Sequence, residues 1–231
     1  MSNKIPYHIV LFPDGNRHWA QKRGLPIFKG YEKGQKKFKE FLHWCKKRGV
    51  KVVTVFGFST ENWKRPKQQV DYLIKLFGKT LSDKENVNQF QKEGIKVKII
   101  GQKEKLPKSL QKIIVDIESL TKNNKKLLLN LAVSYGGRWD ILQAVQKILK
   151  KKPPVKKITE NLIESYLSTS DLPAPDFIIR AGGEKRLSNF LLWQAAYSEI
   201  YFSKKLWPEF TENDLEKAFK EYARRQRRFG R

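Results

Sequence analysis

Hydrophobic residues recur along the chain with two alternating spacings, one typical of strands and one typical of helices. Residues 8–12 form a short apolar run that ends at Pro13, and residues 51–58 form a second run rich in β-branched and aromatic side chains. Further strands are predicted at residues 95–100, 127–134, 176–180 and 199–202. Apolar residues at helical spacing predict helices at 31–45, 70–81, 109–120, 139–149, 160–167 and 215–228, and another helix is expected directly after the turn at residues 14–16.

This alternation predicts an α/β fold with a mostly parallel central sheet of about six strands, flanked by helices on both faces. The chain of 231 residues is long enough to bury a core of its own. The sequence contains no internal repeat, and the Pro153-Pro154 break is too short for a domain linker. We therefore expect a single domain spanning residues 1–231.

The chain is strongly basic, with 48 Lys and Arg against 23 Asp and Glu and a net charge of +25. Such a charge attracts polyanions, which include nucleic acids, anionic membrane surfaces and diphosphate substrates, and it does not choose among them. Cys45 is the single cysteine, so no disulfide can form within the chain, and a cytoplasmic location is expected. The N-terminus lacks the apolar core of a signal peptide, and no stretch has the length of a membrane span.

Polar residues gather directly after four of the predicted strands. These segments are 14–16, 59–66, 134–140 and 180–189. Because the carboxyl ends of parallel strands meet at one edge of a sheet, we expect a ligand site there. The residues favour the handling of anions: Arg180, Arg186 and Ser188 lie beside a Gly182-Gly183 turn whose N–H groups we expect to be exposed, which predicts a phosphate cradle.

Plainer explanations exist for each of these features. Asp14 is also suited to capping a helix, Gly182-Gly183 is also a simple turn, and Arg180 and Arg186 could form surface salt bridges with Glu184. Against them, Asp14 and Glu199 are candidate Mg²⁺ ligands, since Mg²⁺ binds one or two carboxylates together with diphosphate oxygens. The three histidines have no metal-ligand spacing, and there is neither a complete P-loop nor a G-x-G-x-x-G motif.

These residues together resemble the motifs of the cis-prenyltransferases, the family of undecaprenyl diphosphate synthase. The resemblance runs from about residue 7 to the C-terminus. It rests on Asp14-Gly15-Asn16 with Trp19-Ala20, Phe58-Ser59-Thr60-Glu61-Asn62-Trp63 with Arg65-Pro66, residues 130–140, Ile179-Arg180 with Gly182-Gly183-Glu184 and Arg186, residues 188–194, residues 197–202, Leu206-Trp207-Pro208 and Arg227-Arg228-Phe229-Gly230.

The resemblance implies a Mg²⁺-dependent enzyme that condenses isopentenyl diphosphate with an allylic prenyl diphosphate and builds Z double bonds. It implies catalytic roles for five residues, Asp14, Asn16, Ser59, Glu61 and Asn62, with Asp14 also binding the metal and Glu199 completing the metal site. Asn16 and Ser59 would assist proton removal or its relay. Arg180, Arg186 and Ser188 would hold isopentenyl diphosphate. Other expected substrate-binding residues are Gly15, Arg17, His18, Trp19, Trp63, Arg65, Arg228 and Gly230.

Further expectations concern the product and the assembly. An apolar tunnel for the growing chain is expected from Leu73, Ile74, Leu76 and Phe77, together with the strand at Leu127. The tail at residues 228–230 resembles one that reaches a partner's active site, which predicts a homodimer. The basic surface suggests a peripheral contact with an anionic membrane that receives the lipid product.

The chain departs from the family pattern where the allylic diphosphate is expected to bind. His18, Ile27 and Tyr31 replace residues that contact phosphate in the family, and Arg17, Lys22, Arg23 or Lys29 are candidates to compensate. The allylic primer and the product length therefore stay open. Two alternatives also stay open: a catalytically weak subunit that stabilises another prenyltransferase, and a nucleic-acid-binding protein. The second has no recognition motif, so we expect no nucleic acid.

Overall fold

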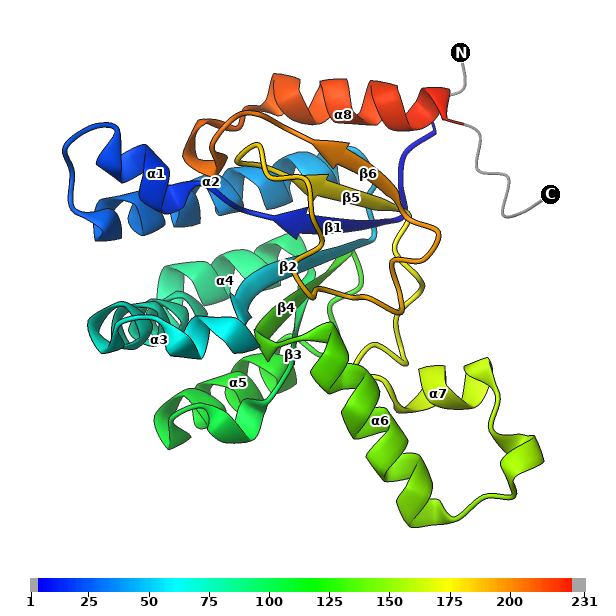
Figure 1. Cartoon of the computed structure of the whole chain (residues 1–231). Helices are drawn as coiled ribbons and strands as arrows, with labels where there is room; N and C mark the ends of the chain where they lie inside the picture. The colour runs from blue at the N-terminus through cyan, green and yellow to red at the C-terminus, as the bar shows by residue number, and fades with distance from the viewer. Residues whose placement is uncertain (1–3, 226–231) are drawn as a thin grey trace.

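A computed structural model describes residues 4–225 and shows a six-stranded, entirely parallel sheet (Figure 1). The strand order is β3-β4-β2-β1-β5-β6. The strands are β1 (His8–Phe12), β2 (Val52–Ser59), β3 (Ile95–Ile100), β4 (Leu127–Tyr135), β5 (Phe177–Arg180) and β6 (Glu199–Phe202). The predicted α/β class and parallel sheet are therefore confirmed.

The helices follow the strands in the expected alternation. They are α1 (Asn16–Gln21), α2 (Ile27–Lys47), α3 (Lys67–Ser82), α4 (Lys84–Glu93), α5 (Lys108–Leu120), α6 (Gly137–Lys151), α7 (Glu160–Tyr166) and α8 (Glu212–Arg224). Among the described residues, four short 3₁₀ helices join them: η1 (Thr60–Lys64), η2 (Lys103–Lys105), η3 (Val155–Lys157) and η4 (Trp207–Glu209). No helix within residues 4–225 combines the length and apolarity needed to cross a membrane.

The two faces of the sheet are covered differently. Alternate strand residues such as Ile9 and Leu11 pack under α2, α3, α5 and α8 in the larger core, which also holds Cys45. Their neighbours Val10 and Phe12 face a smaller core built by an irregular segment around Phe190 and by the start of α6. Helices thus dominate one face, whereas a loop segment covers much of the other.

Helix α4 is the element that hydrophobic spacing did not predict. Its ten residues are mostly polar, and Val87 and Phe90 are its main contribution to the core. Its end signals are nevertheless present, because the Asp83 side chain accepts a hydrogen bond from Asn86 N and Gly94 ends the helix with a positive φ. Capping residues, and not periodicity, would have identified this helix.

A chain of buried polar groups crosses the middle of the sheet. His8 Nδ1 contacts the carbonyl oxygen of Pro173 at 2.7 Å, and because a carbonyl only accepts, Nδ1 carries the proton. His8 Nε2 then accepts from Thr54 Oγ1 at 2.7 Å, and Thr54 accepts from Asn130 Nδ2 at 3.2 Å. Burial of the imidazole lowers the pKa of His8 to about 4.

This burial predicts a loss of stability in mild acid. His8 is protonated below pH 6.5 in the unfolded chain but only below about pH 4 in the folded chain. Unfolding is therefore increasingly favoured as the pH falls from 6.5 to about 4. A shift of this size corresponds to about 3 kcal/mol. Urea unfolding between pH 7 and pH 4 should show this loss in the wild type and a shallower dependence in His8→Gln. His43→Gln, an exposed site on α2, serves as control, and equal slopes in all three proteins would contradict the assignment.

Candidate active site

A cavity of about 560 Å³ opens at the carboxyl edge of the sheet, where the polar segments were expected to meet. Its walls come from the ends of β1, β2 and β5 and from α2 and α3. Eleven of the predicted catalytic and substrate-binding residues line it: Asp14, Gly15, Asn16, Arg17, His18, Ser59, Asn62, Arg65, Arg180, Arg186 and Ser188. Within the described part of the chain, the lining contains four arginines but only two carboxylates, Asp14 and Glu184, so the site favours an anionic ligand.

Arg180 is the buried charge at the centre of this edge. Its Nη2 forms an ion pair with Asp14 Oδ2 at 2.7 Å, and its Nη1 donates to Ser188 Oγ at 3.0 Å and to the carbonyl oxygen of Arg186. The guanidinium also lies over the Phe12 ring at 4.8 Å. Arg180 is therefore not part of a surface salt bridge with Glu184. Arg186 does form an ion pair with Glu184, and the Arg186 side chain is 60% exposed beside the cavity.

The turn that presents Asp14 and Asn16 depends on close packing against α2. Gly15 adopts a φ of +100°, which L residues with side chains rarely adopt. A Cβ on Gly30 would lie 1.9 Å from the carbonyl oxygen of Asn16, and one on Gly34 would lie 2.0 Å from Asn16 Oδ1. Trp207 closes the arrangement, since its backbone N–H donates to the Asp14 carbonyl at 2.8 Å and its Nε1 donates to the Gly34 carbonyl at 2.9 Å.

Asn16 keeps one buried polar atom without a partner. Its Nδ2 donates to the Pro13 carbonyl at 2.8 Å, while its Oδ1 is buried and makes no hydrogen bond within the described chain. Buried acceptors without donors are uncommon because they lose their hydration without compensation. The side chain is thus fixed in orientation, with its unpaired oxygen packed against Gly34 of α2.

The glycine turn after β5 supplies space and not hydrogen-bond donors, which corrects the expectation from the sequence. The N–H of Gly182 donates to the Lys205 carbonyl at 2.7 Å, and that of Gly183 donates to the Ser203 carbonyl at 2.9 Å. Both donors are used within the fold. Gly182 instead allows close approach, because a Cβ there would lie 3.0 Å from Asp14 Cβ. The arginine side chains and Ser188 are therefore the remaining candidates for phosphate binding.

The residues after β2 divide between the cavity and its surroundings. Ser59 and Asn62 form a capping box at the start of η1, with Ser59 N–H donating to Asn62 Oδ1 at 3.2 Å, and both line the cavity. Trp63 lies outside the cavity lining: its Nε1 donates to Ser134 Oγ at 2.8 Å and its ring packs edge-on against Phe58. Its role here is to anchor η1 on β4.

Glu61 faces a neighbouring hollow that it shares with Arg138, Asn189 and Leu192. Its Oε1 accepts from Asn189 Nδ2 at 2.8 Å and from Thr60 Oγ1 at 3.0 Å. Partial burial by itself would raise the pKa of Glu61, but these hydrogen bonds outweigh it and lower the pKa below the ordinary value. Glu61 is therefore a carboxylate at neutral pH and not a proton donor.

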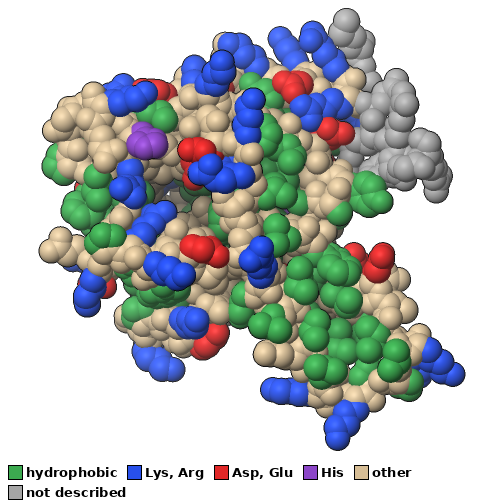
Figure 2. All heavy atoms as spheres, in the orientation of Figure 1, with side chains coloured by type: hydrophobic (Ala, Val, Ile, Leu, Met, Phe, Trp, Pro, Cys, Tyr) green, Lys and Arg blue, Asp and Glu red, His purple; other side chains and the backbone are tan. Residues whose placement is uncertain are grey.

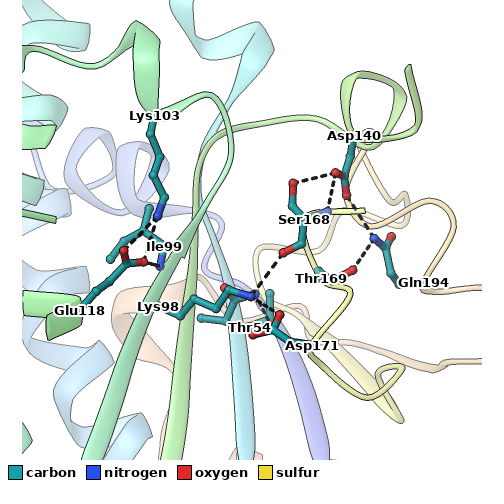
Figure 3. A network of polar contacts seen from close by, with 11 residues as sticks. Thr54, Lys98, Ile99, Lys103, Glu118, Asp140, Ser168, Thr169, Asp171 and Gln194 are labelled. Atoms are coloured by element: carbon teal, nitrogen blue, oxygen red, sulfur yellow. Dashed lines mark hydrogen bonds and ion pairs between the residues drawn. The ribbon is translucent and has the colours of Figure 1, made fainter. Parts of the chain in front are cut away.

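A buried carboxylate, Asp140, holds the loop that carries Ser188. Figure 3 shows Asp140 at the start of α6 with Ser168 and Gln194 pointing toward it. Asp140 accepts from Ser168 N–H at 2.9 Å, from Ser168 Oγ at 2.7 Å and from Gln194 Nε2 at 3.2 Å. Nearby, Gly137 N–H donates to the Asn189 carbonyl at 2.6 Å. The network ties the segment after Arg180 to α6, so Ser188 is held by two elements.

The mouth of the cavity also carries the positions that depart from the family pattern. Arg65 Nη1 donates to Tyr31 Oη at 3.4 Å, and Gln69 Nε2 donates to the same oxygen. Arg17 and His18 line the mouth from α1 with exposed side chains. Trp19 does not line the cavity, and its ring stacks with the guanidinium of Arg23 at 4.6 Å. Tyr31 thus orients Arg65 at the rim.

Away from the mouth the cavity becomes apolar. Leu73, Leu76 and Phe77 line it from α3, as expected, and Leu131 lines it from β4, the strand that begins at Leu127. Ile74 packs against the main core instead. Gly57 lies at an irregularity in the pairing of β2 with β4, and a Cβ there would lie 2.8 Å from the Phe77 ring. The missing side chain lets the Phe77 ring lie against the sheet.

Glu199 does not join Asp14 within one chain. The register pairs Glu199 with Phe177 at the start of β5, whereas Asp14 follows the opposite end of the sheet, next to Arg180. Glu199 forms an ion pair with Arg225 at 2.8 Å. Arg228 and Gly230 lie outside the described residues.

The donor set around Asp14 fits a divalent ion that is shared with a substrate. Among residues 4–225 no group of three or more His, Cys, Asp or Glu could hold a metal ion. Asp14 offers one carboxylate that is 40% exposed, beside arginines that attract a diphosphate. Mg²⁺ is commonly bound by one or two carboxylates, substrate phosphates and water. The residues present fit that arrangement.

Comparison with known proteins agrees with this geometry. Residues 12–230 match the family model described as putative undecaprenyl diphosphate synthase. The chain is 47% identical to an isoprenyl transferase of Thermotoga maritima over 98% of this chain and 97% of the relative. It superimposes with a TM-score of 0.93 on lavandulyl diphosphate synthase from Lavandula x intermedia, solved with dimethylallyl diphosphate, at 37% identity and 98% coverage of each chain. A probable undecaprenyl diphosphate synthase from Campylobacter jejuni gives a TM-score of 0.83 at 34% identity, over 99% of this chain and all of that one. The chain therefore belongs to the undecaprenyl diphosphate synthase family of prenyltransferases.

Proposed function

We propose that this protein condenses isopentenyl diphosphate with an allylic prenyl diphosphate and releases a longer Z-prenyl diphosphate. One observation carries the proposal: a single cavity joins an arginine-rich mouth to an apolar interior. An amphiphile with an anionic head and a hydrocarbon tail matches both parts at once. A nucleic acid would not use the apolar interior.

The residues at the mouth have different roles in the proposed reaction. Arg180, Arg186 and Ser188 bind and orient one diphosphate, and Arg65 and Arg17 face the second. Asn16 and the Ser59 hydroxyl line the mouth, where they would hydrogen-bond the reacting groups and help to relay the proton lost as the new carbon–carbon bond forms, and a diphosphate oxygen would accept that proton. Asp14 would hold Mg²⁺, which when bound would neutralise charge developing on the leaving diphosphate.

We also propose that the working enzyme is a homodimer. An α6–α7 apolar patch, formed by Leu142, Val145, Leu149, Val155 and Ile158, has exposed side chains and contains residues at helical spacing on α6. Figure 2 shows apolar side chains gathered over this region. Exposed apolar patches of this kind commonly mark interfaces. Two copies would also be needed to bring Asp14 and Glu199 to one ion, because one chain keeps them at opposite ends of the sheet.

The location of the protein and its contact with a membrane are a separate question from its activity. Lys and Arg side chains are spread over the visible face in Figure 2 and do not gather in one patch, so no docking face for an anionic membrane is evident there. Cys45 is buried, and burial raises the pKa of its thiol, which suits an inert core position. A cytoplasmic location and a peripheral membrane contact stay predictions from the sequence.

Loss of the Asp14 carboxylate should abolish turnover. Asp14→Asn keeps an oxygen for the buried Arg180, whereas Asp14→Ala leaves that guanidinium unpaired and adds a stability cost. We expect incorporation of radiolabelled isopentenyl diphosphate to fall about 10²-fold or more in both variants. Thermal melting should show Asn as the more stable variant. Activity of Asp14→Asn within a few-fold of the wild type would refute the catalytic role.

Arg186 should contribute mainly to the binding of isopentenyl diphosphate. Its guanidinium is exposed at the rim, so Arg186→Ala removes a charge-assisted contact without disturbing the core. We expect KM for isopentenyl diphosphate to rise about tenfold or more, with a smaller change in kcat. Glu184→Gln is the control, because it frees Arg186 from its ion pair and should not raise this KM. A change confined to the KM of the allylic substrate would mean that the two diphosphate sites are interchanged.

The dimer can be tested by charging the α6–α7 apolar patch. Leu142→Glu/Leu149→Glu keeps good helix formers on α6 but places two carboxylates in the proposed interface. Sedimentation equilibrium should show a dimer for the wild type and a monomer for this variant. Lys112→Glu, at an exposed position on α5, lowers the net charge by the same two units and should stay dimeric. A wild-type monomer at micromolar concentration would overturn the proposal.

A further inference from the structure

One polar pair interrupts the apolar interior of the cavity. Gln35 of α2 and Thr80 of α3 both line it, and Gln35 Nε2 donates to Thr80 Oγ1 at 2.6 Å. The Thr80 hydroxyl in turn donates to the Leu76 carbonyl at 2.7 Å, which fixes its direction. Past Tyr31, the other cavity-lining residues that the structure describes on these two helices are Gly34, Phe38, Leu73, Leu76, Phe77 and Leu81. The pair is therefore a hydrogen-bonded bridge between two otherwise apolar walls.

The bridge joins the first half of α2, where Gln35 follows Gly34, to the end of α3 that lies far from the mouth. Arg65 and Asn62 immediately precede α3, so the first turns of this helix adjoin the mouth. Thr80 lies in its last turn, about 20 Å further along the helix axis at 1.5 Å per residue. Tyr31 and Gln69 join the same two helices near the mouth. A chain growing away from the mouth between α2 and α3 would pass Leu73, Leu76 and Phe77 before it met the bridge.

Passing the bridge has a physical cost. A hydrocarbon chain that moved between Gln35 and Thr80 would have to separate them, and the Gln35 amide would then face hydrocarbon without its partner. An unsatisfied buried amide is strongly disfavoured relative to a hydrogen-bonded one. Thr80 would lose less, because its donation to Leu76 remains. The bridge thus opposes further penetration by its bulk and by the hydrogen bond that would be broken.

We propose that the Gln35–Thr80 bridge limits the length of the prenyl chain that this enzyme makes. The inference rests on the proposed condensation activity and names a specificity-determining pair for it. The walls before the bridge accept added isoprene units by apolar contact, and the bridge makes the next unit unfavourable. Product is then released in preference to further elongation.

Product sizing tests the proposal directly. The wild type and Gln35→Ala/Thr80→Ala would be given radiolabelled isopentenyl diphosphate and a series of allylic diphosphates of increasing length. In the double variant we expect the ratio of products longer than the wild-type limit to shorter ones to rise about tenfold or more, a change equivalent to about 1.4 kcal/mol. Thr80→Ser keeps the hydroxyl and the bridge, so its product distribution should match that of the wild type.

A second pair of substitutions guards against loss of folding. Gln35→Met/Thr80→Val removes the hydrogen bond with little change of volume, and it should shift products in the same direction if the alanine variant fails to melt cooperatively. An unchanged product distribution in a folded, active double variant would overturn the proposal and leave the condensation activity standing.

Binding of an unreactive probe tests the length limit set by the Gln35–Thr80 bridge separately from the proposed condensation activity. Straight-chain alkyl phosphates of increasing length should raise the Tm of the wild type up to a limiting chain length, and that limit should be longer in Gln35→Ala/Thr80→Ala. If the wild type incorporates no isopentenyl diphosphate with any primer, the proposed function is wrong. The longest alkyl phosphate that raises the Tm still shows whether the bridge blocks the cavity. Equal limits in both proteins would refute the bridge.

Discussion

The buried guanidinium of Arg180 is the interaction on which the active edge depends. A charge taken out of water must be paired and hydrogen-bonded, or the fold loses several kcal/mol. Here Asp14 from the end of β1 neutralises it, while Ser188 and the Arg186 carbonyl, both from the segment after β5, accept from it. One buried cation therefore orients the candidate metal-binding carboxylate and holds the segment that carries two candidate phosphate-binding groups, Arg186 and Ser188.

Two different constraints produce the two halves of the cavity. The mouth forms because parallel strands end together, so the residues after β1, β2 and β5 meet at one edge. The interior forms because α2 and α3 stand over β2 and β4, where Gly34 lets α2 approach Asn16 and Gly57 lets the Phe77 ring lie against the sheet. These two glycines thus set how closely the walls of the cavity approach each other. An anionic head and an apolar tail are recognised by parts of one continuous space.

Local sequence patterns predicted the architecture and much of the rim. β-branched runs and helical apolar stripes indicated every strand and most helices, because burial of one face follows from spacing alone. The capped polar helix α4 escaped this reasoning, since its apolar residues are too few to form a stripe. At the rim, residues that follow strands, such as Asp14, Ser59 and Arg180, lie where the parallel topology requires them. Their side-chain partners were not predictable, because those partners come from distant segments.

The sequence by itself determined the fold class, the edge of the sheet that carries the site and the family, since these depend on local spacing and on motif order. Tertiary structure alone decided which polar groups are free to act. In the fold, the Gly182 and Gly183 N–H groups form backbone hydrogen bonds, and Trp19 and Trp63 lie outside the cavity lining. Glu199 lies at the opposite end of the sheet from Asp14. The fold also joins Gln35 to Thr80 across the apolar interior. The reason is that hydrogen bonds and ion pairs are settled by distances between residues far apart in the chain, which no local pattern records.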